Sequence, residues 1–427
     1  MVKTVIPPGL ALQAWDWNGI IGTGQSLSVG ARAEQLRSTE PSYRNLMLGW
    51  ERPSWRRELK PLDALVPLRE PIRPFAKRFP GPYPYNIYGE TPHTAMASEI
   101  TSLFLALSEG AGDYVSVHTV VGESGQALRV IAQGATRTDD AGHAFEASLL
   151  ETRTLSRLAK AAQRSFGIAA VILTHGESDA TNPDYARGLS ELWRSYNTAL
   201  PPLTGQTRAI PLLLTQQSSC PAEPGSTADS ALAAWVAANT HEGDIVCVGP
   251  RYQYGYVADG VHLDALAYDQ LGEKYGQAYF EHVVRGRPWR ALEPHRVTCA
   301  GRKVRVDFQV PVAPLIWDER MPPGAAHPAW VRGRGFEVSA GAEPLEILSA
   351  RIDGDSVELT LGRDPPTEVR VGYALTAAAA PRPHGAQRWG QLRDADPFVG
   401  ATTGTAAPNF AVTFQSTARC EGAASPR

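Results

Sequence analysis

The order of apolar and amphipathic segments through the first two thirds of the chain is the feature that most constrains its fold. Short, nearly continuous apolar runs, typical of strands covered on both faces, occupy residues 19–23, 114–121, 169–174, 210–215 and 245–248. Helical patterns separate or follow them at residues 94–107, 146–166, 184–199, 230–238 and 265–284. This alternation predicts an α/β fold, an open parallel sheet with helices on both sides.

The pattern changes near residue 288, where hydrophobic residues begin to alternate with period two. Alternating segments occupy residues 304–310 and parts of 345–352, 356–361 and 368–373, with Gly, Pro and Asp between them. Short alternating strands of this kind predict an antiparallel β-sandwich. We therefore expect two domains, one at 1–287 and one at 288–427, since 427 residues are enough for two buried cores.

Composition argues against several classes of partner. Hydrophobic residues make up 43% of the chain and charged residues 20%, as in ordinary globular proteins. The net charge is −3 and no basic field is present to collect phosphates, so we expect no nucleic-acid partner. No apolar run reaches the ~18–20 residues of a bilayer-spanning helix, so we expect no membrane span. Nothing in the composition specifies an oligomeric state.

The N-terminal segment does not have the form of an intact signal peptide, because Pro7–Pro8 interrupts it and Lys3 is its only basic residue. Two locations stay open: the cytoplasm, or the periplasm or cell exterior if a leader has been removed. The four cysteines show no CxxC or Cys/His metal spacing. Cys247 lies in an apolar run and is expected to be a buried thiol. Cys299 and Cys420 bracket the C-terminal region and can pair if the protein is exported.

Residues 31–90 form an insertion rich in Pro and aromatic residues, including Trp50 and Trp55. A long segment without periodicity, directly after the first strand, is expected to wrap over the site. Its aromatic side chains either pack as glue, which is the commoner case, or form a platform for sugar rings.

The first predicted strand ends in a glycine-rich turn that contains Ser26. In one interpretation, Gly22 and Gly24 let the backbone bend so that Ser26 presents its hydroxyl to a crevice and its N–H to an oxyanion. In another, the two glycines are part of a dinucleotide fingerprint, which is incomplete because Leu27 stands where a Gly or Ala is expected. The Gly-x-Ser-x-Gly elbow does not match, because Ser28 replaces its last glycine. A serine in such a turn is by itself more often a helix cap.

A second motif, Asp259-Gly260-Val261-His262, follows the last predicted strand of the first region. A serine hydroxyl needs a base to take its proton, and the base needs an acid to fix its tautomer. An aspartate three residues before a histidine can serve the imidazole from behind, while the other ring nitrogen faces the serine. Asp264 is a competing carboxylate, but its position suits a cap of the following helix.

Two further segments follow predicted strands. His175-Gly176-Glu177-Ser178-Asp179 crowds polar groups after the middle strand, and Gly122–Leu128 can turn a backbone N–H into the site. A metal site of His175, Glu177 and Asp179 is the alternative, and the absence of a second histidine at a recognised spacing argues against it. In an open parallel sheet the loops after different strands converge at one edge. That convergence favours a hydrolase, and the acyl-transfer mechanism expected for it needs no metal and no organic cofactor.

Together these segments resemble the four sequence blocks of SGNH hydrolases, a class of GDSL-like serine esterases. The Gly24-Gln25-Ser26 sequence, in place of Gly-Asp-Ser, is similar to the sialate O-acetylesterase and acetylxylan esterase branch. The resemblance implies a three-layer α/β/α, flavodoxin-like catalytic domain, and the β-rich C-terminal region looks like that of some carbohydrate esterases of this branch.

The resemblance also implies roles for individual residues. Ser26 would be the nucleophile, His262 the general base and Asp259 its orienting acid, with the N–H groups of Ser26 and Gly125 in the oxyanion hole. His175 stands where this branch has a glutamine and would be a third oxyanion donor through a ring N–H. Candidate substrate-binding residues are Gln25, Glu177, Asp179, Trp50 and Trp55.

The expected function is therefore removal of O-acetyl groups from an acetylated saccharide or polysaccharide through an acyl-enzyme intermediate. Two alternatives stay open. A lipid esterase or thioesterase on the same scaffold would have an apolar tunnel and prefer long acyl chains. A catalytically inactive carbohydrate-binding protein is the other, and the presence of Ser26, Asp259 and His262 argues against it.

Overall fold

A computed structural model describes residues 15–50, 61–73, 89–138, 141–219, 226–240, 243–321, 328–378 and 385–421. It contains a parallel-rich sheet of seven strands, in the order β3-β2-β4-β1-β5-β6-β7. The strands are β1 (Trp17–Gly24), β2 (Leu46–Trp50), β3 (Pro61–Pro67), β4 (Ser116–Val120), β5 (Phe166–Thr174), β6 (Leu212–Gln216) and β7 (Ile245–Pro250). All neighbours pair in parallel except β2 and β3, which are antiparallel. The α/β prediction is confirmed.

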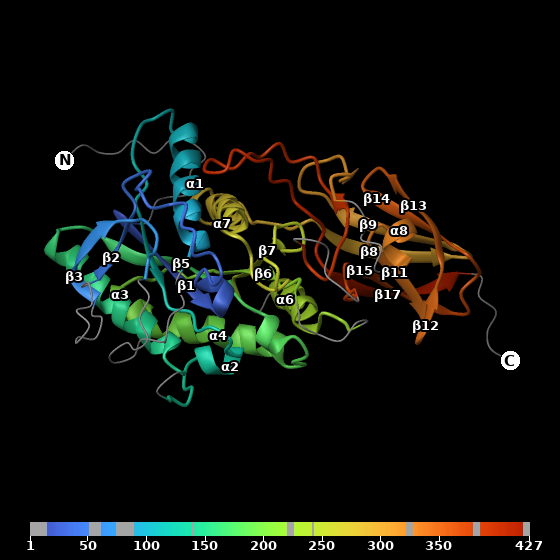
Figure 1. The fold of residues 1–427 in the computed structure, drawn as a ribbon, viewed down its shortest axis with the longest axis horizontal. Coiled ribbons are helices and arrows are strands. Elements are labelled where there is room, and N and C mark those ends of the chain that lie inside the picture. Colours follow the sequence, from blue (N-terminus) through green and yellow to red (C-terminus); the bar gives the residue numbers. More distant parts are fainter. Residues whose placement is uncertain are drawn as a thin grey trace.

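Helices cover both faces of this sheet, as Figure 1 shows, with α1 and α7 on one side and α3 and α4 on the other. The longer helices are α1 (Pro92–Leu107), α3 (Ala144–Ala161), α4 (Tyr185–Ala199), α6 (Asp229–Asn239) and α7 (Ala265–Tyr279), which a π-helical turn (Phe280–Val284) extends. Helix α1 begins at Pro92, whose missing N–H costs nothing there, and the Thr91 side chain accepts the N–H of His93. Gly272 lets α7 approach α1 closely, since a Cβ there would lie 2.2 Å from the Pro92 carbonyl oxygen.

Two details of the first region differ from the sequence prediction. The insertion at 31–90 supplies β2 and β3, which extend the sheet at one edge, where no strand was expected. The helix predicted over 146–166 ends at Ala161, and Phe166 begins β5. Between them Gln163 adopts a positive φ of 55°, which ends the helix. The sequence prediction joined the two elements because their apolar patterns follow each other without a break.

The C-terminal region forms a separate eight-stranded sheet, in the order β12-β11-β15-β17-β8-β9-β14-β13. Its strands are β8 (Glu293–Ala300), β9 (Lys303–Gln309), β11 (Phe336–Ala340), β12 (Glu343–Leu345), β13 (Ile347–Asp353), β14 (Ser356–Leu361), β15 (Glu368–Tyr373) and β17 (Phe414–Glu421). Neighbours are antiparallel except β17 and β8. A short pair, β10 (Ile316–Trp317) with β16 (Leu392–Arg393), and the helix α8 (Pro328–Gly333) lie beside it.

This sheet folds over on itself. Strands β9 and β11 are four places apart in the strand order, a spacing of roughly 19 Å in a flat sheet. The rings of Phe308 on β9 and Phe336 on β11 nevertheless have centroids only 6.3 Å apart. Its two halves therefore pack face to face around an aromatic interior. Cys299 and Cys420 form a disulfide where β8 meets β17, which settles the pairing that the sequence left open.

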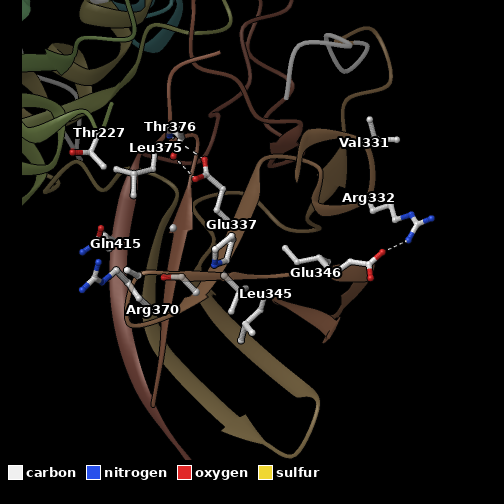
Figure 2. A pocket seen from close by; sticks show the side chains of 16 residues that line it. Thr227, Val331, Arg332, Glu337, Leu345, Glu346, Arg370, Leu375, Thr376 and Gln415 are labelled. Atoms are coloured by element: carbon white, nitrogen blue, oxygen red, sulfur yellow. Dashed lines mark hydrogen bonds and ion pairs between the residues drawn. The ribbon is translucent and has the colours of Figure 1, made fainter. Parts of the chain in front are cut away.

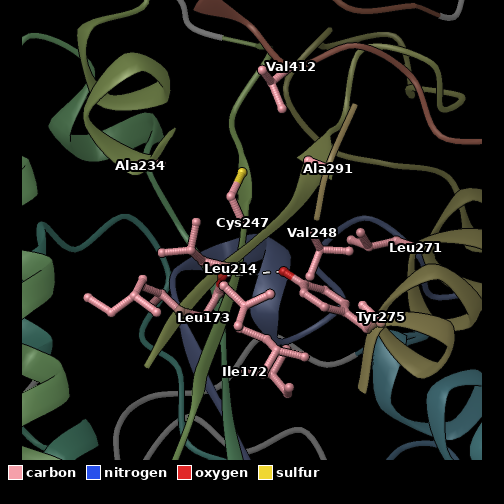
Figure 3. Close-up of a cluster of buried hydrophobic side chains, with 14 of the residues drawn as sticks. Ile172, Leu173, Leu214, Ala234, Cys247, Val248, Leu271, Tyr275, Ala291 and Val412 are labelled. Atoms are coloured by element: carbon pink, nitrogen blue, oxygen red, sulfur yellow. Dashed lines mark hydrogen bonds between the residues drawn. The ribbon is translucent and has the colours of Figure 1, made fainter. Parts of the chain in front are cut away.

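One hydrophobic core runs through both regions. Figure 3 shows Cys247 and Val248 of β7 between Tyr275 of α7 and two residues of the C-terminal part of the chain, Ala291 and Val412. Cys247 is a free, buried thiol as predicted, and burial raises its pKa to about 12. The change from one sheet to the other falls between the end of β7 and the start of β8. None of the helices in the described residues is long and apolar enough to cross a bilayer.

Candidate active site

The strand order fixes where a site can lie. Strand β1 has β4 on one side and β5 on the other, and the chain continues outward from β5 to β6 and β7. At such a reversal of strand order the connecting loops separate and leave a crevice beyond the carboxyl ends of the strands. Gly24, the last residue of β1, is paired with Thr174, the last residue of β5. Ser26 and the segment that begins at His175 follow directly.

The turn that carries Ser26 requires glycine. Gly24 has φ +136°, and a Cβ there would lie 2.1 Å from the Thr174 carbonyl oxygen. The same carbonyl accepts the N–H of Gln25 at 3.2 Å, and this bond holds the turn against the end of β5. Ser26 then opens a single 3₁₀ turn, Ser26–Ser28, with only 5% of its surface exposed.

His262 joins Ser26 to Asp259. Its Nε2 lies 2.9 Å from the Ser26 Oγ, and its Nδ1 lies 2.8 Å from the Asp259 carboxylate. Because the carboxylate can only accept, Nδ1 carries the proton, and Nε2 is left to accept the serine hydroxyl. The structure thus brings together the three side chains that the sequence singled out.

The carboxylate of Asp259 is fixed by its own loop. Its Oδ1 accepts the backbone N–H groups of Val261 and His262, each at 2.9 Å. Partial burial favours the neutral form, but these two bonds and the imidazole outweigh it and hold the pKa of Asp259 below its ordinary value. The predicted cap is also confirmed: Asp264 accepts the N–H of Ala267 at 2.8 Å and begins α7.

A buried ion pair, which the sequence analysis missed, anchors the loop that carries Asp259 and His262. Arg251 is fully buried, and its guanidinium donates to Glu177 at 2.6 Å, to the His175 carbonyl at 3.3 Å and to the Gln216 carbonyl at 3.2 Å. It therefore ties the ends of β5 and β6 to the start of the loop after β7. Through this bond Glu177 has a positioning role, and its expected contact with substrate stays a prediction. An arginine directly after an apolar strand, Pro250-Arg251, was the available signal.

The glycine-rich turn after β4 lies beside Ser26. The N–H of Glu123 donates to the Gly24 carbonyl at 2.9 Å, and a Cβ on Gly122 would lie 1.9 Å from the Ser28 hydroxyl. Gly125 has a left-handed φ of +73°. Within the described residues, neither its N–H nor that of Ser26 has a hydrogen-bond acceptor. Two backbone donors of the kind that an oxyanion needs are therefore free.

The prediction for His175 needs correction. Its Nε2 lies 3.0 Å from the Gln126 carbonyl and its Nδ1 lies 2.9 Å from the Tyr185 hydroxyl. The carbonyl takes the one N–H of the neutral ring, and burial, which lowers the pKa of His175, keeps the ring neutral. No ring N–H remains for an oxyanion. The contact with Gln126, which lies 49 residues away in the chain, could not be predicted from the sequence.

The other candidate substrate-binding residues have different surroundings. Asp179 accepts the Leu128 N–H at 2.6 Å and the Asn182 amide at 2.7 Å, so it holds the site's turns together. Gln25 accepts the Ser178 N–H at 3.0 Å, while its amide nitrogen donates to none of the described residues. Trp50 ends β2, with the Arg73 guanidinium 5.6 Å from its ring centroid. Trp55 lies outside the described residues.

No family model matches the chain, and no curated protein matches its sequence. Its structure is similar to that of a carbohydrate acetylesterase from Xanthomonas citri, with a TM-score of 0.56 and 15% identity over 94% of this chain and 80% of that one. An Arabidopsis thaliana protein has 16% identity and a TM-score of 0.42 over 62% of this chain and 98% of its own. NanS has 14% identity and a TM-score of 0.39 over 65% and 98%. The first comparison supports the α/β hydrolase part of the fold expected from the sequence resemblance.

Proposed function

We propose that this chain, which has the fold of an SGNH-type carbohydrate acetylesterase, is itself a serine esterase that removes acetyl groups from an acetylated carbohydrate. The observation that carries the proposal is one imidazole bonded on both sides, to the Ser26 hydroxyl at 2.9 Å and to the Asp259 carboxylate at 2.8 Å. This is the arrangement that turns a serine into a nucleophile at neutral pH.

In the first half of the reaction, His262 takes the hydroxyl proton as the Ser26 Oγ attacks the ester carbonyl. The negative charge that develops on the carbonyl oxygen is stabilised by the N–H groups of Ser26 and Gly125, which have no acceptor within the described residues. Asp259 stabilises the imidazolium, which then protonates the departing sugar hydroxyl. The acetyl group remains on Ser26.

In the second half, His262 takes a proton from water, which attacks the acetyl-serine and releases acetate. The reaction requires neither a metal nor an organic cofactor. With His175 engaged elsewhere, we assign the free amide of Gln25, next to the nucleophile, as the side-chain donor that contacts the substrate.

Assignment of the C-terminal sheet follows from the same resemblance. We propose that residues 288–427 are an accessory β-sandwich, and that residues 1–287 hold all of the catalytic groups. The face-to-face packing of the two halves of the sheet supports this assignment.

The decisive experiment measures acetate release by the purified protein from a panel of acetylated glycans, with Ser26→Ala as the inactive control. Release from at least one glycan, lost in Ser26→Ala, supports the proposal. The rates on p-nitrophenyl acetate and octanoate then separate an acetylesterase from the lipid esterase alternative. Faster turnover of octanoate with no acetate release from any glycan would contradict it.

A further inference from the structure

A hollow lies on the C-terminal sheet, far along the chain from Ser26. It has a volume of about 850 Å³, within the range of pockets that bind small molecules. Its floor is the outer face of β11, β15 and β17, and α8 and the β12 segment form one wall. Thr227, just before α6 of the first region, reaches the opposite rim (Figure 2).

The register of the strands explains the hollow. Gly372 on β15 lies between Glu337 on β11 and Gln415 on β17, so the middle of this row has no side chain. The next row on the same face places Ser339 beside Arg370. Leu375 folds back over Gly372, where a Cβ would lie 2.9 Å from its Cδ2. The result is a trough with a leucine at one end and polar side chains along both sides.

Most charges around the trough are already compensated. Both carboxylate oxygens of Glu337 accept hydrogen bonds from Thr376, one from its N–H and one from its hydroxyl. Arg332 pairs with Glu346 at 2.7 Å, as the dashed line in Figure 2 shows. Arg370 differs, because within the described residues its guanidinium has neither an ion pair nor a hydrogen bond. One cation therefore remains available in the trough.

The remaining lining is half apolar and half polar. Leu345 and Leu375 are only 5% exposed, so the exposed apolar surface comes mainly from Val331, which is 60% exposed. The lining also holds the Ser339 hydroxyl and the Gln415 amide, neither of which has a described partner. No aromatic side chain lines the trough among the described residues. The surface suits a ligand with an apolar face, several hydroxyls and one anionic group.

We propose that this trough binds a saccharide unit that carries a carboxylate, such as a hexuronate residue of an acidic polysaccharide. A pyranose ring offers an apolar face for Val331 and hydroxyls for Ser339 and Gln415. Its carboxylate matches the planar fork of the Arg370 guanidinium, which binds carboxylates through two parallel hydrogen bonds. The inference goes beyond the proposed esterase activity and does not depend on it, since no catalytic group takes part.

Calorimetric titration of the full chain with a galacturonate trisaccharide tests the proposal. Its methyl ester serves as the uncharged match, and octanoate as an apolar anion without hydroxyls. We expect the trisaccharide to bind and the two control ligands not to bind. Its affinity should fall at least about tenfold in Arg370→Gln, the usual effect of removing a charge-assisted hydrogen bond. Arg419→Gln, on the neighbouring strand outside the trough, should leave the affinity unchanged.

Equal binding of the ester, preference for octanoate, equal losses in Arg370→Gln and Arg419→Gln, or no binding at all would each overturn the proposal. Hydrolysis of p-nitrophenyl acetate by the Arg370→Gln variant is a separate control for folding. Because that assay reads Ser26 and the titration reads Arg370, an inactive esterase with an intact binding site remains distinguishable from an active esterase that has none.

Discussion

The parallel strands have two ends, here called the amino edge and the carboxyl edge of the sheet. Both edges hold the same kinds of side chain, in different arrangements. At the amino edge, the Ser165 hydroxyl bonds to Asp16 at 2.8 Å, and His282 pairs with Asp244 at 2.8 Å. Among the described residues, the Asp16–Ser165 pair has no histidine and the Asp244–His282 pair has no serine. At the carboxyl edge one imidazole joins a serine and an aspartate.

The difference lies in the backbone that carries these groups. Gly24 and Gly122 allow two turns to approach each other at the carboxyl edge, and the loop after β7 brings in both His262 and Asp259. The amino-edge residues lie directly before β1, β5 and β7 and in the π-helical turn that extends α7. Convergence of loops, and not residue type, makes the candidate site.

Replacing Ser26 and Ser165, the serines at the two edges, should give the largest difference in kcat. Ser26→Ala is expected to lower kcat by about 10⁵- to 10⁶-fold, as loss of a serine nucleophile does in comparable hydrolases. Ser165→Ala, which removes the same hydroxyl from the other edge, should leave kcat within about twofold. Rates on p-nitrophenyl acetate with matched circular dichroism spectra give the comparison. Similar losses in both variants would show that the edges do not differ.

The paired aspartates give the next largest contrast. Asp259→Asn is expected to lower kcat by about 10⁴-fold, because an amide can donate to Nδ1 and so select the wrong tautomer of His262. Asp244→Asn breaks an aspartate–histidine pair that has no serine, and it should not change kcat. Steady-state kinetics of both variants decide between these expectations. A small loss in Asp259→Asn would mean that another acid orients His262.

The motifs at the carboxyl edge could be predicted from the sequence. The residues and strands that hold them in place could not. Strands and their following motifs could be predicted because each is a contiguous pattern, an apolar run that ends in glycine or a charged residue. Arg251, the two ring contacts of His175 and the edge strands β2 and β3 were missed. Most of these depend on partners from distant segments, such as Glu177 for Arg251 and Gln126 for His175, which one sequence does not reveal.

The buried Arg251–Glu177 pair extends the comparison of the two edges to the free energy of unfolding. Arg251→Met should cost about 3–5 kcal/mol, since it leaves the Glu177 carboxylate buried and unpaired. Adding Glu177→Gln should restore part of the loss. Arg208→Met, near the amino edge, removes one hydrogen bond to the Val283 carbonyl and should cost about 1 kcal/mol or less. Urea unfolding measures each value, and equal costs at the two sites would refute a special role for Arg251.

A smaller effect concerns the contact between α1 and the C-terminal part of the chain. Glu99 accepts the Ala401 N–H, and burial, together with the nearby Glu273, raises its pKa from the ordinary 4.5 to about 7. The folded state therefore holds a proton that the unfolded chain has lost between these values, so this group lowers stability as pH rises through that window.

Glu99→Gln keeps the acceptor and removes the charge. It should stabilise the protein by about 1–2 kcal/mol at pH 8 and have little effect at pH 4.5. Urea unfolding at the two pH values measures the difference, with the exposed Glu191→Gln as control. A gain that is the same at both pH values would contradict the assignment to ionisation of Glu99.

The central claim is that His262 activates Ser26, and phosphonylation of the full chain by a fluorophosphonate probe tests it most directly. We predict that the probe labels Ser26, as identified by peptide mass spectrometry, and that labelling slows at least about a hundredfold in His262→Ala, the lower range for loss of a general base. A folded protein that is labelled at another serine, or at Ser26 with the same rate in both forms, would contradict the account.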